Sequence, residues 1–243
     1  MHTYSRQWFT TFLGNIDESV VAREVEFIAR QIGRAKSVLD LCCGPGRHAA
    51  PLVERGYRLV GLDVDEVALR DAQRRAPGAS LIRGDMRRLP LASESMDAVL
   101  CMWQSFGHFD SDTNAAVLAE MARVLRPNGH LILDVYHRDF HAARLGERTI
   151  ERDGVRVREQ RSMSNGRLRA ALTYADGSSD IFDWQLYVPD ELAELGERSG
   201  LTPVLACAEF NEATPASSAL PRMQLVFCGV ASTLCALPSA LCP

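Results

Sequence analysis

Five short runs of mostly apolar residues recur through the first 136 residues, and helical patterns separate them. The runs are SVLDL (37–41), RLVGLD (58–63), SLIRGD (80–85), DAVLCM (97–102) and HLILDVY (130–136). A run of this kind is typical of a strand that is buried in a parallel sheet. The alternation therefore predicts an α/β fold, in which helices cover both faces of a mostly parallel sheet. Ligands bind at the carboxyl ends of such strands, so the residues that end these runs are candidates for a binding site.

The pattern changes after about residue 146. Residues 147–188 alternate polar and apolar positions, and they include Asn165-Gly166, a dipeptide that favours a tight hairpin turn. They predict an antiparallel β insertion that forms a lid. The predicted division is a core of residues 1–146 and 189–230, the lid at 147–188 and a C-terminal tail at 231–243.

The composition is that of an ordinary globular protein, with 47% hydrophobic and 24% charged residues. Its net charge of −4 provides no overall basic field, so we expect no nucleic-acid partner. No run approaches the roughly 18 apolar residues of a membrane helix. The opening residues MHTYSRQWFT lack the apolar segment of a signal peptide. We therefore expect a cytoplasmic monomer or homodimer with no membrane partner.

The seven cysteines form no CxxC pair. Cys42 and Cys43 are adjacent, which is poor geometry for a shared tetrahedral metal site. We expect reduced thiols, as in cytosolic proteins, and no metal ion.

The stretch VLDLCCGPGRHA (38–49) places a glycine loop directly after a strand. It fits the dinucleotide fingerprint, and Asp63, 17 residues after Gly46, fits the acid that binds a ribose. A nicotinamide-dependent oxidoreductase is therefore one interpretation. However, Pro45 removes an N–H donor, and Asp40 places a negative charge where it would repel a pyrophosphate. Both features suit a nucleoside that carries positive charge and no phosphate, as S-adenosylmethionine does.

Five stretches match a known family in its own order and spacing. They are VLDLCCGPG (38–46), VGLD (60–63), GDMRRLP (84–90), MDAVLCM (96–102) and VLRPNGHLILD (124–134). In these the sequence resembles the class I S-adenosylmethionine-dependent methyltransferases. The resemblance implies a Rossmann-like, seven-stranded, mostly parallel sheet whose last strand is antiparallel. It also implies S-adenosylmethionine as cofactor and S-adenosylhomocysteine as product.

Within that family, the sequence is similar to the branch that acts on small molecules. CMWQSFGHF (101–109), Tyr4 and the hairpin insertion resemble the amino-sugar N-methyltransferases, while Ser218 to Arg222 resembles bacterial members of unknown substrate. The resemblance implies methyl transfer to a nitrogen or an oxygen of a small molecule, and the acceptor itself stays open. One departure from the family is Cys42, which stands where many members have the first loop glycine. Its backbone must avoid angles that only glycine adopts easily, or be strained.

The expected cofactor site follows from the matched motifs. Asp63 is expected to accept hydrogen bonds from both ribose hydroxyls, and Asp85 from the adenine amino group, with Met86 as an apolar wall. An aspartate that only caps a turn is the alternative for each acid. The full set of expected cofactor-binding residues is Asp40, Cys43, Gly44, Gly46, Asp63, Val64, Asp85, Met86 and Met102.

His108 and Tyr4 are the expected catalytic residues. An imidazole with a pKa near ~6.5 can accept the proton of an amine or a hydroxyl, although His108 would serve equally by orienting the acceptor. Tyr4 is expected to close over the cofactor. The expected acceptor-binding residues are Trp103, Phe106, His137, Arg138 and Arg222. Their alternatives are core packing for the two aromatic residues and a surface salt bridge for Arg222.

Three other functions stay open at this point. The acceptor could be a macromolecule instead of a small molecule. The chain could be the oxidoreductase described above, which would bind NADH. It could also bind S-adenosylmethionine without catalysing a reaction, in which case core side chains would fill the acceptor pocket.

Overall fold

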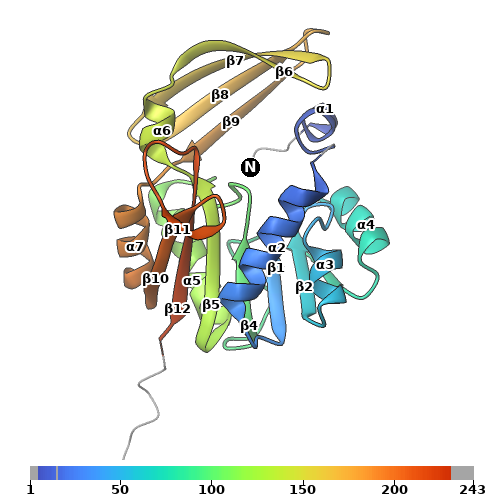
Figure 1. The fold of residues 1–243 in the computed structure, drawn as a ribbon, viewed down its shortest axis with the longest axis vertical. Helices are drawn as coiled ribbons and strands as arrows, with labels where there is room; N and C mark the ends of the chain where they lie inside the picture. Colours follow the sequence, from blue (N-terminus) through green and yellow to red (C-terminus); the bar gives the residue numbers. More distant parts are fainter. Residues whose placement is uncertain (1–4, 15, 231–243) are drawn as a thin grey trace, which may run out of the picture.

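The computed structural model describes residues 5–14 and 16–230, which form two β-sheets (Figure 1). In spatial order, the strands of the main sheet are β11 (Asn211–Pro215), β10 (Leu201–Ala208), β12 (Arg222–Gly229), β5 (Leu125–Tyr136), β4 (Met96–Cys101), β1 (Ser37–Leu41), β2 (Arg58–Asp63) and β3 (Ser80–Arg83). The strands from β5 to β3 are parallel, and β12 runs antiparallel to β5. The predicted fold class is therefore confirmed, together with its antiparallel last strand.

The prediction of seven strands is wrong, because the main sheet has eight. The additional strand is β11, which pairs with β10 through a hairpin. Its turn residues, Glu209 and Phe210, both have a φ of 57°. Residues 211–215 (NEATP) are mostly exposed and carry none of the apolar alternation that would predict a strand.

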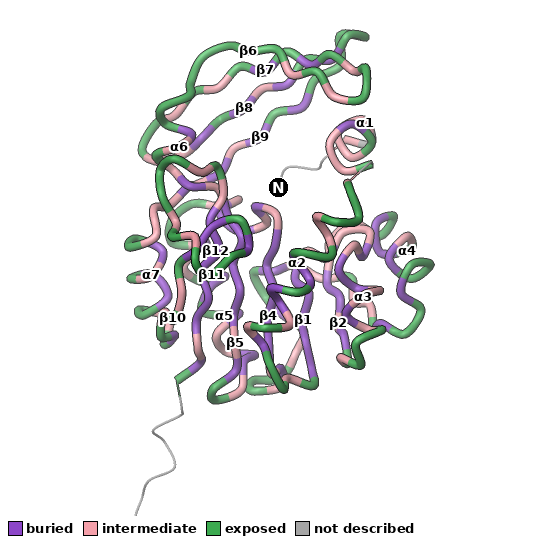
Figure 2. The backbone as a smooth tube through the Cα atoms, viewed as in Figure 1, coloured by how far each residue is buried: buried purple, intermediate pink, exposed green. Residues whose placement is uncertain are grey.

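Helices cover both faces of the main sheet, and the strands between them are buried (Figure 2). On one face, α2 (Glu18–Ile32) and α3 (Ala49–Glu54) cover one cluster of buried apolar side chains. On the other face, α5 (Ser111–Val124) and α7 (Pro189–Arg198) cover a second cluster. A further helix, α4 (Glu66–Arg75), contacts β2 and β3. None of the helices that the structure describes is long and apolar enough to cross a membrane.

Helix α2 has clear start and stop signals in the sequence. The carboxylate of Asp17 caps its first turn by accepting a hydrogen bond from the Ser19 N–H at 2.7 Å. Gly33 follows its last turn with a φ of 51°, a left-handed conformation that favours glycine. The buried face of the helix is apolar except for Glu24, whose side chain has no exposed surface.

The second sheet lies over the carboxyl ends of the parallel strands (Figure 1). It consists of β6 (Gly146–Arg152), β7 (Val155–Ser164), β8 (Arg167–Tyr174) and β9 (Ser179–Gln185), all antiparallel. A short helix, α6 (Arg138–Ala142), precedes it in the chain. This is the separate antiparallel sheet that the sequence predicts. The predicted tail, residues 231–243, lies outside the described residues.

The first described residues pack against the second sheet. They form α1 (Arg6–Trp8) and a π-helical turn, η1 (Phe9–Leu13). The Ser5 hydroxyl donates to the Asp180 carboxylate at 2.6 Å. The rings of Trp8 and Phe182 meet edge to face, with centroids 5.7 Å apart. This segment therefore belongs to the same packed unit as β9.

We predict that Gly196→Ala destabilises the fold. A β-carbon at Gly196 would overlap the fully buried ring of Phe227, at 2.8 Å from its Cδ1. Overpacking of this kind costs about 1–3 kcal/mol, against a gain of about 1 kcal/mol in helix propensity. The free energy of unfolding in urea should therefore fall. Glu197→Ala, at an exposed position of the same helix, is the control and should leave it nearly unchanged. A Gly196 variant as stable as this control would contradict the packing described.

Candidate functional site

The glycine loop, residues 42–48, connects β1 to α3. Gly44 and Gly46 have positive φ angles of 52° and 74°. A β-carbon at Gly46 would lie 2.9 Å from the Cβ of Ala72, so this glycine permits close approach of the loop to α4. A β-carbon at Gly44 would meet no atom within 4 Å, so that side of the loop is open. Cys42 has a φ of 60°, and its backbone is therefore strained, one of the two outcomes expected from the sequence.

Asp63 is the last residue of β2, and its carboxylate is hydrogen-bonded to the glycine loop. One carboxylate oxygen accepts the Gly44 N–H at 2.8 Å, and the other accepts the Asp65 N–H at 2.9 Å. Burial raises the pKa of Asp63, although these N–H donors oppose the shift. The carboxylate therefore makes the turn-capping contact considered from the sequence. Each of its oxygens keeps a lone pair that could accept from a hydroxyl group.

Asp40 lies in β1, which has a neighbouring strand on each side, and is only 2% exposed. Its Oδ2 atom has no hydrogen-bond partner among the described residues. Burial raises the pKa of Asp40 to about 6, although the charges of His48 and Arg47 oppose the shift. A buried carboxylate oxygen without a donor is costly, and a cationic ligand would satisfy it. The residues present therefore fit the ammonium-bearing nucleoside that the sequence predicts.

The other expected cofactor residues lie near the same edge. Cys43, Met86 and Met102 are buried, and Val64 is half-buried. The Met86 sulfur lies 3.8 Å from the Cys42 sulfur. Among residues 5–14 and 16–230, no three His, Cys, Asp or Glu side chains are grouped so that they could hold a metal ion.

Asp85 is half-buried and already has a partner. It forms an ion pair with Arg87, whose Nη2 lies 2.6 Å from Oδ2, and it accepts the Arg87 backbone N–H at 2.9 Å. These contacts lower the pKa of Asp85. A contact with adenine would therefore share the carboxylate with Arg87.

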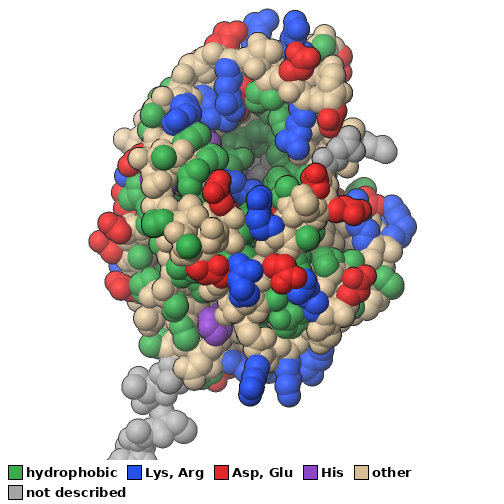
Figure 3. Space-filling model, in the orientation of Figure 1, with side chains coloured by type: hydrophobic (Ala, Val, Ile, Leu, Met, Phe, Trp, Pro, Cys, Tyr) green, Lys and Arg blue, Asp and Glu red, His purple; other side chains and the backbone are tan. Residues whose placement is uncertain are grey.

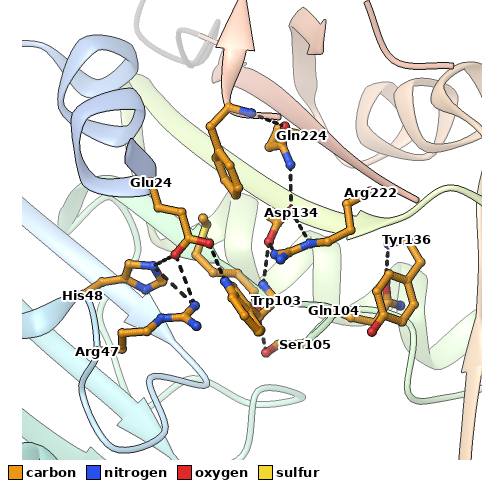
Figure 4. Close-up of polar contacts among 12 residues, drawn as sticks. Glu24, Arg47, His48, Trp103, Gln104, Ser105, Asp134, Tyr136, Arg222 and Gln224 are labelled. Carbon is orange, nitrogen blue, oxygen red and sulfur yellow. Dashed lines mark hydrogen bonds and ion pairs between the residues drawn. The ribbon is translucent and has the colours of Figure 1, made fainter. Parts of the chain in front are cut away.

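A buried network joins the glycine loop to α2 and to the segment after β4 (Figure 4). At its centre, Glu24 accepts hydrogen bonds from Trp103 Nε1 at 2.6 Å and from His48 Nε2 at 2.8 Å. The Arg47 guanidinium lies 3.3 Å from the same carboxylate. Burial opposes ionisation, but the His48 hydrogen bond and the charges of His48, Arg47 and Arg222 hold the pKa of Glu24 below its usual range. Glu24 is therefore a buried carboxylate that keeps its charge.

Trp103 stands between two guanidinium groups. The Cζ atoms of Arg47 and Arg222 lie 3.8 and 4.5 Å from its ring centroid. Trp103 and Gln104 both have a left-handed backbone, with φ angles of 55° and 59°. The Trp103 N–H donates to Asp134 Oδ2 at 2.8 Å, which holds this strained segment in place.

Arg222 begins β12 and pairs with Asp134, which has no exposed surface. Gln224 Nε2 donates to the same carboxylate at 2.8 Å. The Arg222 side chain is only 22% exposed, and burial lowers its pKa to about 10. The surface salt bridge considered from the sequence is therefore a largely buried ion pair at the edge of the site.

Two of the expected site residues, Phe106 and His108, lie in different environments in the structure. Phe106 has no exposed surface and packs in the core, with its ring centroid 5.7 Å from that of Tyr187. It presents no surface to an acceptor in this conformation. His108 is half-buried, and its ring centroid lies 6.3 Å from that of Trp184 in the second sheet. Tyr4, the other expected catalytic residue, lies outside the described residues.

His137 and Arg138 have different surroundings in the structure. His137 is 4% exposed, its Nδ1 has no partner among the described residues, and burial lowers its pKa. The Arg138 guanidinium pairs with both carboxylate oxygens of Glu191, at 2.5 and 2.6 Å. Arg138 lines a cavity of about 330 Å³ beside α7, and no residue of the glycine loop lines it. The expectation that Arg138 binds the acceptor therefore finds no support in its position.

The surface is hollowed between the second sheet and the main sheet, and hydrophobic side chains line the hollow (Figure 3). Phe182 and Trp184 stack on β9 with centroids 5.2 Å apart, and Tyr136 meets Trp184 edge to face at 5.8 Å. Trp184 Nε1 is buried and has no hydrogen-bond partner in the described part of the chain.

The sequence analysis missed Glu24, Arg47, His48, Asp134 and Gln224. A signal existed for Glu24, an acid within the apolar face formed by Val25, Ile28 and Ile32. Acids are seldom buried without partners, so such a position indicates a buried pairing. No local pattern marks the others, because their partners are distant in sequence.

Comparison with known proteins finds similar sequences over part of the chain. Residues 38–129 match the family described as "Methyltransferase domain". The chain is 38% identical over 96 residues to the demethylmenaquinone methyltransferase of Beutenbergia cavernae, covering 40% of this chain and 39% of that protein. It is 32% identical over 134 residues to the dTDP-3-amino-3,6-dideoxy-alpha-D-glucopyranose N,N-dimethyltransferase of Streptomyces fradiae, covering 54% and 52%. The chain thus spans about half the length of these relatives or less.

Solved structures of similar fold extend over more of the chain. The sugar N-methyltransferase KedS8 from Streptoalloteichus has a TM-score of 0.70 at 21% identity, covering 95% of this chain and 94% of that one. CalS10, an amino pentose methyltransferase from Micromonospora echinaspora, has a TM-score of 0.69 at 19% identity, covering 94% and 98%. At these identities the likeness concerns the fold. Residues 38–129 of the chain thus match a methyltransferase domain, and the chain shares its fold with solved methyltransferases.

Proposed function

We propose that this protein transfers a methyl group from S-adenosylmethionine to a nitrogen or an oxygen of a small molecule. The observation that carries the proposal is the buried, unpartnered carboxylate oxygen of Asp40 beside the glycine loop. A phosphate-bearing dinucleotide would be repelled there, whereas a cationic nucleoside supplies the missing donor. The names of the relatives described above support methyl transfer as the reaction.

Different residues of the chain would bind different groups of the cofactor. Asp40 would face the α-ammonium group, and Asp63 would accept from the ribose hydroxyls. The open side of Gly44 leaves room for the backbone of the loop to approach the ligand. When bound, S-adenosylmethionine supplies a methyl group that its sulfonium makes electrophilic.

For the acceptor, we propose that amine nitrogen is the first chemistry to examine. A relative and two structures of similar fold are named as methyltransferases of amino sugars or of sugar nitrogen. His108 would accept the proton that the acceptor loses, or orient the acceptor. Trp103 would form part of the wall of the acceptor site. Residues 147–188 would serve as a lid that excludes water from the hollow.

Titration calorimetry with S-adenosylhomocysteine tests the cofactor assignment. We expect the wild-type protein, freed of copurified cofactor, to bind this ligand and not NADH. Asp63→Ala should weaken binding by about 1–3 kcal/mol, because ribose hydroxyls lose their acceptor. Asp71→Ala, on α4 where Asp71 pairs with Arg74, is the control and should bind as the wild type does. Equal affinity in the Asp63 variant would remove Asp63 from the site, and binding of NADH alone would favour the oxidoreductase.

The affinity for S-adenosylhomocysteine should depend on pH through Asp40. Because burial raises the pKa of Asp40 to about 6, the carboxylate is charged above this pH and protonated below it. We therefore expect affinity to fall as the pH is lowered through about 6, approaching about tenfold per pH unit. Calorimetry at several pH values measures this. In Asp40→Asn the affinity should be low and this dependence absent, and a variant with the wild-type pH profile would exclude Asp40 as its source.

His108→Ala should separate chemistry from cofactor binding. With an amine found by screening for a methyl mass shift, turnover should fall by about 10²-fold if His108 acts as the base. The affinity for S-adenosylhomocysteine should stay close to that of the wild type. The matched control is His130→Ala, within β5, where His130 is in register with Ala98 of β4. Wild-type turnover in the His108 variant would leave this histidine a packing role.

A further inference from the structure

Glu24 contacts two segments that flank the proposed site from different sides. His48 and Arg47 belong to the glycine loop, and Trp103 follows β4 on the proposed acceptor side. These two segments are more than 50 positions apart in the sequence, yet both donate to one carboxylate on α2. Figure 4 shows the three side chains converging on Glu24.

The carboxylate depends on all of these donors. Glu24 has no exposed surface, so water cannot replace a partner that moves away. A buried charge that loses its donors is strongly unfavourable, whereas one with good geometry is tolerated. Movement of the glycine loop would therefore act on the Trp103 indole through Glu24, since both sets of donors must keep their geometry together. This path adds to the direct contact of the Arg47 guanidinium with the Trp103 ring.

Residues 102–106, the segment that contains Trp103, are held by several hydrogen bonds and would therefore move together. The Trp103 N–H is fixed to Asp134, and Gln104 Nε2 donates to the Phe106 carbonyl at 3.0 Å. The Ser105 hydroxyl donates to the Met102 carbonyl at 2.8 Å. A change transmitted to the Trp103 ring would thus reach residues 102–106 together, and His108 follows directly.

We propose that Glu24 is a positioning residue that couples the glycine loop to the Trp103 segment. Binding of the cofactor at the loop sets the position of the wall against which the acceptor lies. The inference rests on the proposed function, since it takes residues 42–48 as the cofactor loop. Glu24 itself touches neither the cofactor nor the acceptor in this scheme.

Tryptophan fluorescence can test the coupling without a known acceptor. The chain has three tryptophans, so Trp8→Phe combined with Trp184→Phe leaves Trp103 as the only one. S-adenosylhomocysteine should change the emission of Trp103 in this background. Adding Glu24→Gln should reduce the change, since only the direct contact of Arg47 with the Trp103 ring is left at full strength, while calorimetry still detects binding. The control is Glu26→Gln, on the same helix but exposed and paired with Arg55, which should keep the change.

The outcomes separate this inference from the proposed function. Absence of S-adenosylhomocysteine binding to the wild-type chain would overturn both. Binding with no change in Trp103 emission, or a change of wild-type size in Glu24→Gln, would overturn only the coupling.

A second variant covers the case in which Glu24→Gln fails to fold. Trp103→Phe keeps an aromatic ring between the two arginines but removes the indole N–H that donates to Glu24. In the wild type, hydrogen–deuterium exchange should slow on ligand binding in both residues 42–48 and 103–108. In Trp103→Phe the slowing should stay in 42–48 and be smaller in 103–108, and wild-type slowing of both segments would contradict the inference.

Discussion

Parallel pairing brings the carboxyl ends of β3, β2, β1, β4 and β5 to one edge, and the whole site depends on this alignment. Asp40 is registered against Gly61 on one side and Leu100 on the other, so its strand is enclosed by two neighbours. Asp63, the last residue of β2, has a register partner on one side only, Arg83 of β3, and it remains half-buried while Asp40 is almost fully buried. The position of each aspartate along its strand therefore sets the electrostatic difference between two residues that look alike in sequence.

Three buried carboxylates lie toward this edge, and they differ in their partners. Glu24 and Asp134 are surrounded by donors from distant parts of the chain. Asp40 keeps one oxygen without a partner among the described residues. Since an unpartnered buried polar atom is costly, proteins retain one mainly where function requires it. The contrast between the paired carboxylates and Asp40 thus marks the point at which a ligand completes the structure.

The sequence predicts the parts of the molecule that local patterns determine. Short apolar runs specify the parallel strands, and the acids that end them, Asp40 and Asp63, lie at the predicted edge. The sequence does not predict Asp134 as the centre of a network, because its donors come from the segment after β4 and from β12. A position next to the end of a strand also does not determine where the side chain points. For this reason the sequence does not predict that Phe106 lies in the core and Arg138 beside α7. The sequence also does not predict the short strand β11, because its pairing comes from the hairpin and not from apolar residues.

Strand β11 affects how copies of the protein can associate. The outer edge of a sheet offers free N–H and C=O groups to any strand that approaches. At β11 that edge is short, ends in Pro215 and is mostly polar. Its Glu212 is also held by Arg30 at 2.9 Å and Gln31 at 2.6 Å, both from α2. The β11 edge of the main sheet is therefore a poor template for strand addition. Pairing of two copies of the protein through this edge is disfavoured.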